Sequence, residues 1–189
     1  MSLAFVFPGQ GSQSVGMLAG LADTCPQVHE TFAQASAVLG YDLWALVQSG
    51  PEAELNQTHK TQPAMLAAGV AVWRVWQAQA GKMPVIMAGH SLGEYTALVC
   101  AGALEFTDAV RLVAERGRYM QDAVPAGQGA MAAILGLEDA QVIQVCGDAA
   151  QGEVVSAVNF NSPGQVVVAG AAAAVAGVVD LAKQAGAKR

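Results

Sequence analysis

The sequence is poor in charge and in histidine. Charged residues make up 13% of the 189 positions, the formal net charge is −6, and no run of Lys or Arg occurs. This balance argues against nucleic acid or an anionic membrane as a partner. The histidines, His29, His59 and His90, are too few and too scattered for a metal site. We therefore expect no metal and no permanently bound cofactor.

Cysteine is also scarce. Cys25, Cys100 and Cys146 form no C-x-x-C pair, and their odd number predicts inert core thiols in a reducing compartment, the cytoplasm. No charged stretch precedes the first apolar residues, so no signal peptide is visible. The longest expected helix, 64–80, contains Arg74 and two Gln, which argues against a membrane span.

Apolar residues are abundant instead, at 53%. They predict a packed core in which helices cover a buried sheet. The central feature is Gly89-His90-Ser91-Leu92-Gly93, between an apolar strand (85–89) and an expected helix (95–101) that Gly102 ends. Strand, tight turn and helix around G-x-S-x-G are typical of a nucleophile elbow, with Ser91 as the nucleophile. The Leu92 N–H then lies at a helix N-terminus, where an oxyanion is favoured. The alternative is a strand–helix turn with an incidental serine.

A glycine-rich loop follows the first expected strand, 3–7. It runs from Pro8 to Met17, but Ser14 stands where G-x-G-x-x-G requires glycine, and no G-K-[ST] occurs. A nucleotide loop is thus disfavoured. Close approach of the backbone to a substrate explains these glycines better.

Several helices are expected before the elbow. A polar connection, 56–61, should leave His59 exposed, and small residues at 67–69 should pack closely against the sheet or the elbow. Gly40 should end the first long helix, and Gly50-Pro51 should break the next. The expected helices span 26–39, 41–47 and 64–80, with a short turn from Pro51.

The next helix should run from Thr107, as its N-cap, to about Val124. Arg116 lies beside its apolar face and has two interpretations. It can be a surface cation paired with Glu115 or Asp108, or a semi-buried guanidinium that binds a substrate carboxylate. The apolar face comprises Val110, Val113, Gly117, Met120 and Val124.

Composition changes at Gly127-Gln128-Gly129, which predicts subdomains 1–126 and 127–189. The second shows a β-α-β-β-α order, with strands at 130–135, 154–160 and 165–169 and helices at 137–146 and 171–185. A ferredoxin-like split β-α-β fold needs one more strand. The first subdomain offers only two convincing central strands. We therefore expect an α/β enzyme that is incomplete at its C-terminus.

Six stretches together resemble malonyl-CoA:acyl-carrier-protein transacylase, in order and spacing, over the whole chain. They are Phe7-Pro8-Gly9-Gln10-Gly11-Ser12-Gln13, Thr61-Gln62-Pro63-Ala64, Gly89-His90-Ser91-Leu92-Gly93-Glu94-Tyr95, Arg116-Gly117 with Met120-Gln121, Gly129-Ala130-Met131-Ala132-Ala133 and Asn159-Phe160-Asn161-Ser162-Pro163-Gly164-Gln165.

The resemblance implies an α/β-hydrolase-like large subdomain and a small ferredoxin-like one. It implies ping-pong transfer of malonyl from malonyl-CoA, through a malonyl-serine ester, to the phosphopantetheine thiol of acyl carrier protein in fatty-acid biosynthesis. By the same resemblance, Ser91 is the nucleophile, the N–H groups of Gln10 and Leu92 form the oxyanion hole, Arg116 binds the malonate carboxylate, and Gln62, Asn159 and Asn161 lie near the substrate.

One departure from the family stands out. The family's base is a histidine that follows the serine, but here no histidine follows Ser91, and His90 should point away from it across the turn. A serine hydroxyl needs such a base, so we expect the 189-residue chain to be inactive alone. The alternatives are a serine thioesterase or hydrolase on the same elbow, or an inactive fragment that binds carrier protein.

Overall fold

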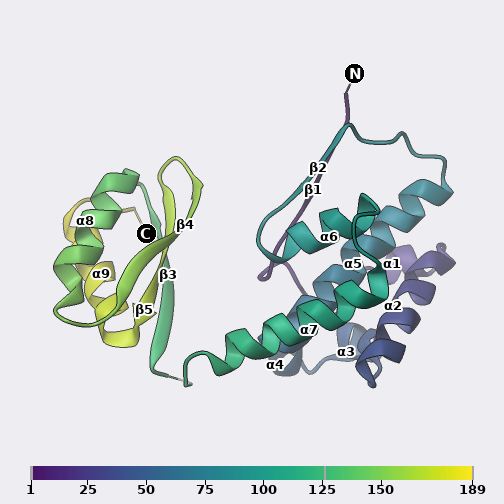
Figure 1. Ribbon diagram of the computed structural model, residues 1–189, viewed down its shortest axis with the longest axis horizontal. Helices are drawn as coiled ribbons and strands as arrows, with labels where there is room; N and C mark the ends of the chain where they lie inside the picture. The colour runs from purple at the N-terminus through teal and green to yellow at the C-terminus, as the bar shows by residue number, and fades with distance from the viewer. Residues whose placement is uncertain (1, 126, 189) are drawn as a thin grey trace. The chain divides into compact units, whose positions relative to one another are not determined.

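The computed structural model describes residues 2–125 and 127–188. It divides into two compact units, Met1–Ala123 and Val124–Arg189 (Figure 1). The boundary expected between 126 and 127 involves residue 126, which lies outside the described residues. In the first unit the elements are β1 (Ala4–Phe7), α1 (Ala19–Ala22), α2 (Pro26–Leu39), α3 (Leu43–Ser49), α4 (Glu52–Leu55), α5 (Thr58–Ala78), β2 (Ile86–Gly89), α6 (Leu92–Cys100) and α7 (Phe106–Asp122).

β1 and β2, the two strands expected in this unit, form a parallel two-stranded sheet, but Val6 and Ile86 are exposed, so the expectation of a buried sheet was wrong. The register pairs Ala4 with Ile86 and Phe7 with Gly89. Because the strands are parallel, their carboxyl ends meet at one edge. The glycine-rich loop after β1 and the turn after β2 are therefore neighbours, and α6 packs against both strands (Figure 1).

α5 is the central helix of the first unit, and it packs against α2, α6 and α7. The small-residue stretch on it packs as expected: a Cβ on Gly69 would lie 2.6 Å from Thr96 Cγ2. α2 matches its expected range, and Gly40 ends it with a φ of 75°. α3 begins two residues later than expected, after Asp42, whose carboxylate accepts the Ala45 N–H at 2.9 Å.

The prediction of a polar connection at 56–61 was wrong. α5 already begins at Thr58, one turn before Pro63. The N–H groups of Lys60 and Thr61 both donate to the Gln57 carbonyl at 2.8 Å. These bonds close the first turn of α5 before Pro63, so the missing N–H of that proline does not affect them. His59 is accordingly half-buried rather than exposed.

Two expectations for α7 also fail. Its N-cap is Glu105 rather than Thr107, which lies inside the first turn. The apolar face is buried at Val110, Val113 and Gly117, but Met120 and Val124 remain 49% and 48% exposed. The apolar spacing therefore describes a buried face only as far as Gly117, and Val124 lies beyond the end of α7 at Asp122.

The second unit has the predicted β-α-β-β-α order. Its elements are β3 (Gly129–Leu135), α8 (Asp139–Ala150), β4 (Val155–Ser162), β5 (Gln165–Ala171) and α9 (Ala172–Gln184). β5 lies between β3 and β4 and is antiparallel to both. Val166 and Val168 of β5 are fully buried and form a core with residues of both helices, including Val142 of α8 and Val178 of α9.

Within the described residues, no helix is long and apolar enough to cross a membrane, and no cluster of potential metal ligands occurs. The three cysteines are buried as free thiols. Burial raises the pKa of the Cys100 thiol to about 12, against a smaller opposing effect of Arg74. A thiol held protonated in this way is a poor nucleophile, so the prediction of inert core thiols holds for Cys100.

Candidate active site

Ser91 lies at the turn between β2 and α6. β2 ends at Gly89 and α6 begins at Leu92, so the intervening residues must reverse direction within two positions. Ser91 takes φ 53° and ψ −108°, a backbone conformation that side-chain-bearing residues rarely adopt. The side chain is exposed. This is the strained strand-to-helix turn expected of a nucleophile elbow.

Gly89 and Gly93, on either side of Ser91, must be glycine because nearby backbone leaves no room for a side chain. A Cβ on Gly89 would lie 1.9 Å from the carbonyl carbon of Gly93. A Cβ on Gly93 would lie 2.2 Å from the Phe7 carbonyl oxygen. Both contacts are with backbone, which cannot move aside as a side chain can. The elbow thus closes on itself and on the end of β1.

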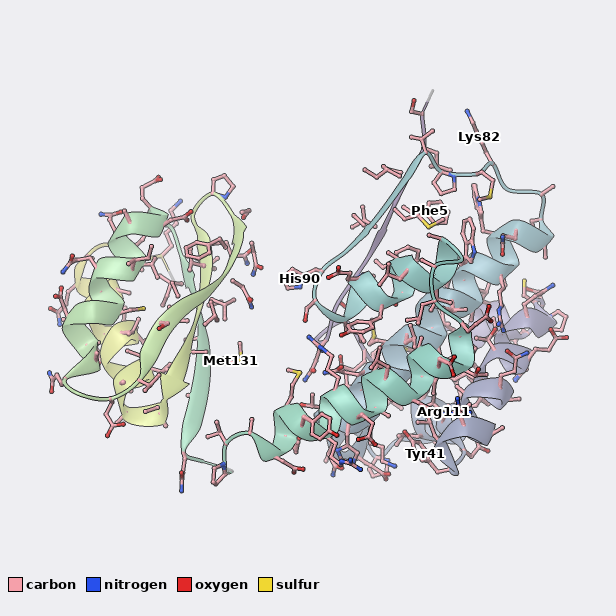
Figure 2. All side chains as sticks on the ribbon, in the orientation of Figure 1. Phe5, Tyr41, Lys82, His90, Arg111 and Met131 are labelled. Atoms are coloured by element: carbon pink, nitrogen blue, oxygen red, sulfur yellow. The ribbon has the colours of Figure 1, made fainter. Side chains whose placement is uncertain are left out.

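The loop after β1 lies against this turn. The His90 N–H donates to the Phe7 carbonyl at 3.2 Å. A Cβ on Gly9 would stand 2.8 Å from the His90 carbonyl oxygen and 3.4 Å from its Nδ1. Figure 2 shows His90 at the turn that follows β2. Gln10 therefore follows directly after Gly9, the residue that lies against the elbow. Leu92 is the first residue of α6, so its N–H has no acceptor within the helix.

The hydrogen bonds of Arg116 distinguish between the two interpretations of its side chain. Its Nη2 donates to Ser91 Oγ at 3.0 Å, and its Nη1 donates to Gln62 Oε1 at 2.8 Å. The surface partners considered for it are engaged elsewhere: Asp108 pairs at 2.7 Å with Arg111, the residue labelled in Figure 2, and Glu115 pairs with Arg118. The guanidinium is thus half-buried beside Ser91 rather than paired at the surface, and its binding of a substrate carboxylate stays a prediction.

Gln62 connects Arg116 to the core. Its side chain is fully buried on α5. While its Oε1 accepts from Arg116, its Nε2 donates to Met120 Sδ at 3.2 Å. A buried amide with both ends hydrogen-bonded is held in one orientation, because breaking either bond would leave a desolvated polar group. Gln62 therefore fixes the direction of the guanidinium.

The arrangement favours binding of an anion beside the serine. A guanidinium has five N–H donors in a planar fork and no acceptor. Ser91 and Gln62 take one donor each, so donors remain for a carboxylate. The centre of the guanidinium also lies 5.6 Å from the Tyr95 ring centroid. That ring orients the cation without neutralising it.

The remaining predicted residues lie on β4. Asn159 is half-buried and Asn161 is exposed. Their role in substrate binding stays a prediction.

Sequence reasoning missed two contributors. Tyr95 falls inside the elbow motif, but only the helix geometry shows that it faces Arg116. Met120 was assigned to an apolar face, while its sulfur in fact accepts from Gln62. Their helical spacing, Tyr95 four residues after Ser91 and Met120 four after Arg116, is the signal that could have identified both.

Comparisons with known proteins identify the family of this chain. A family model described as an acyl transferase domain matches residues 4–189. Malonyl CoA-acyl carrier protein transacylases from Salmonella typhimurium and Escherichia coli are each 66% identical over 186 residues, which is 98% of this chain and 60% of each relative. The Bacillus subtilis transacylase is 46% identical over 188 residues, 99% of this chain and 59% of that relative.

Solved structures give the same result. A complex of a type II PKS acyl-carrier protein with its malonyl-transacylase matches at 62% identity and a TM-score of 0.97, over all of this chain and 61% of that one. An acyl carrier protein S-malonyltransferase from Vibrio cholerae matches at 64% identity and a TM-score of 0.95, over all of this chain and 62% of that one. The chain thus spans about 60% of the length of the curated relatives it matches.

Proposed function

Because the chain belongs to the acyl transferase domain family, we propose that it carries the acyl-accepting half of a malonyl transferase. Malonyl-CoA is the donor and acyl carrier protein the acceptor, in fatty-acid biosynthesis. One observation carries the proposal: Arg116 donates to both the serine of the elbow and the buried Gln62. A fixed cation beside a serine nucleophile suits an acyl group that ends in a carboxylate.

The proposed reaction is ping-pong. Ser91 Oγ attacks the thioester carbonyl of malonyl-CoA and loses its proton to a base. The tetrahedral intermediate then expels the coenzyme A thiolate, which takes up a proton, and leaves a malonyl-Ser91 ester. The phosphopantetheine thiol of the carrier attacks this ester in turn and releases Ser91. The N–H groups of Gln10 and Leu92 stabilise both oxyanions, each by about 3 kcal/mol.

Arg116 binds the distal carboxylate of the malonyl group in this scheme. It cannot be the base, because an arginine guanidinium stays protonated in proteins. Gln62 keeps the guanidinium aimed at the serine side, and Asn159 and Asn161 are proposed to complete the substrate's surroundings. The reaction requires no metal and no resident cofactor.

We further propose that residues 1–189 alone do not transfer malonyl at a useful rate. No histidine follows Ser91 in these residues, and Ser91 Oγ accepts a hydrogen bond from the Arg116 guanidinium, which cannot act as a base. Imidazole added to the solution should partly replace the base, so malonyl should accumulate on the Ser91 peptide only with imidazole present. Peptide mass mapping after incubation with malonyl-CoA measures this, and Ser91→Ala gives the background from direct acylation by imidazole.

Two outcomes would contradict this account. Robust turnover without imidazole would show that a group within residues 1–189, such as His90, serves as the base. Rapid release of free malonate from the Ser91 ester would favour the serine hydrolase alternative, because a transferase protects its ester from water until the thiol arrives.

A further inference from the structure

We propose that Gln13 is a positioning residue for the oxyanion hole. Its side-chain amide, braced by Asn56, sets the orientation of the loop that presents the Gln10 N–H. The proposal rests on the proposed role of Gln10 as an oxyanion donor. Gln13 itself touches neither the substrate nor the serine in this scheme.

The contacts of Gln13 fix the backbone next to Gln10. Gln13 Oε1 accepts the Gly11 N–H at 2.8 Å, and Gln13 Nε2 donates to Asn56 Oδ1 at 2.8 Å. Gly11 has a φ of 103°, so the chain turns sharply at this point. The peptide that follows Gln10 is therefore held by one amide, and that amide is anchored on another segment of the chain.

The side chain of Gln10 is held as well. Gln10 Nε2 donates to Thr58 Oγ1 at 3.3 Å. With its side chain and its following peptide both bound, Gln10 can present its main-chain N–H in few directions. Preorganised donors of this kind stabilise an oxyanion without reorganising during the reaction.

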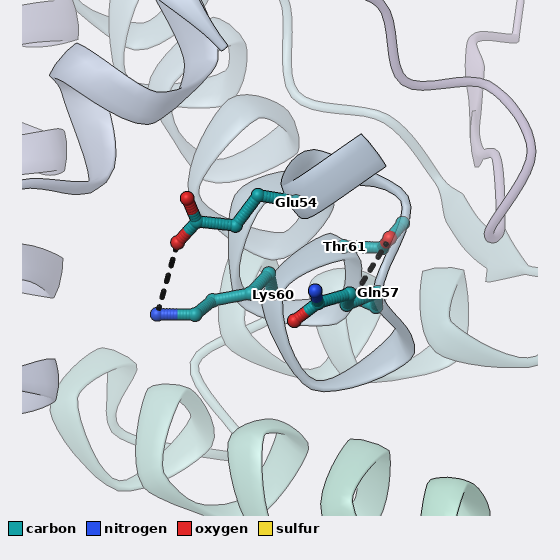
Figure 3. A network of polar contacts seen from close by, with 4 residues as sticks. All are labelled: Glu54, Gln57, Lys60 and Thr61. Atoms are coloured by element: carbon teal, nitrogen blue, oxygen red, sulfur yellow. Dashed lines mark hydrogen bonds and ion pairs between the residues drawn. The ribbon is translucent and has the colours of Figure 1, made fainter. Parts of the chain in front are cut away.

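The anchors of this loop are themselves rigid. Asn56 and Thr58 belong to a segment, 56–62, that we call the α4–α5 junction. Figure 3 shows two of its supports: the Thr61 hydroxyl donates to the Gln57 carbonyl at 3.1 Å, and Lys60 pairs with Glu54 at 3.7 Å. Thr61 is fully buried, and its single hydroxyl proton is shared with the nearer Leu55 carbonyl at 2.5 Å. The buried hydroxyl supplies most of the stabilisation, since a partly exposed ion pair contributes little.

A ring contact adds to the junction. Lys60 Nζ lies 3.3 Å from the Tyr41 ring centroid. Burial, and secondarily the charge of Glu54, raise the pKa of Tyr41 to about 12. The ring under the lysine thus stays neutral near physiological pH, and the cation–π contact persists there.

The same junction also holds Arg116. Gln62 at its end accepts from Arg116, and a Cβ on Gly117 would lie 2.6 Å from His59 Cα. The α7 backbone therefore lies directly against the junction beside the guanidinium. One short segment thus anchors both the loop of the oxyanion donor and the proposed carboxylate-binding residue, and it sets their separation.

Site-resolved amide hydrogen exchange on the 189-residue chain tests the proposal. In Gln13→Leu we expect the Gly11 amide to exchange at least about tenfold faster. Gln13→Glu should retain protection, because a carboxylate accepts from Gly11 and the Asn56 amide can turn to donate to it. The Gly16 amide, which donates to the Val47 carbonyl in the same loop, should be unchanged. Gln48→Leu, which removes the bond from Gln48 Nε2 to the Met17 carbonyl, is the matched control.

A second measurement separates positioning from general loosening. With imidazole present, Gln13→Leu should slow acylation of Ser91 about equally for malonyl-CoA and acetyl-CoA, since both pass through the same oxyanion. An unchanged Gly11 exchange rate, a joint loss of Gly16 protection, an unchanged acylation rate, or an altered malonyl-to-acetyl ratio would each overturn the proposal. If wild type forms no Ser91 ester at all, the proposed function fails, and the exchange data alone decide the role of Gln13.

Discussion

Replacing Arg116 with alanine should abolish the preference of Ser91 for malonyl over acetyl. A carboxylate bound by a guanidinium gains about 1.5–3 kcal/mol from charge-assisted hydrogen bonds. At about 1.4 kcal/mol per factor of ten, the malonyl-to-acetyl ratio of Ser91 esters should fall roughly 10- to 150-fold. The ratio is measured by mass mapping after incubation with equal malonyl-CoA and acetyl-CoA in the presence of imidazole.

α7 itself provides the control for this experiment. Arg118 lies two residues further on, is exposed and pairs with Glu115, so Arg118→Ala should leave the ratio unchanged. Arg116→Lys should fall in between, because an ammonium keeps the charge but loses the planar fork. An unchanged ratio in Arg116→Ala would contradict carboxylate binding by this residue and leave the hydrolase alternative in place.

The second large effect concerns folding of the elbow. Gly93→Ala should destabilise the first unit by about 3 kcal/mol, because its Cβ would meet the Phe7 carbonyl oxygen at 2.2 Å and the backbone would have to shift to relieve the contact. Gly89→Ala should behave alike, with a contact of 1.9 Å to the backbone of Gly93. Urea unfolding followed by tryptophan fluorescence reports this unit, since all three tryptophans lie within it.

Gly20 is the matched control for the glycine substitutions. Nothing lies within 4 Å of a Cβ built there, and its φ is not in the left-handed region. Gly20→Ala should therefore change the unfolding midpoint little, or raise it slightly through helix propensity. A Gly93→Ala chain as stable as wild type would show that the elbow is not closed as described.

The sequence predicted the elements around the elbow well, for physical reasons. Alternation of apolar runs with glycine and proline located β1, β2 and α2, and G-x-S-x-G requires the crowded turn that the structure shows around Ser91. Boundaries that depend on individual hydrogen bonds were less predictable. The early start of α5 depends on hydrogen bonds to the Gln57 carbonyl, which no periodicity reveals.

The site was predictable in its residues but not in its connections. Ser91 and Arg116 could be named from motif and resemblance. The distances from Arg116 to Ser91 and Gln62 were needed to place its guanidinium at the elbow rather than in a surface ion pair, and its contact with a substrate stays a prediction. The link from Gln13 to Asn56 joins residues 43 positions apart, and a single sequence carries no signal for such a pair.

The location of the covalent malonyl group tests the central claim most directly. The 189-residue chain is incubated with malonyl-CoA and imidazole, digested, and mapped by tandem mass spectrometry. We expect malonyl as an ester on Ser91, sensitive to hydroxylamine, and absent from Ser91→Ala. Malonyl confined to lysine side chains, or equal labelling of Ser91 after denaturation, would contradict the account, because the folded elbow would then give Ser91 no special reactivity.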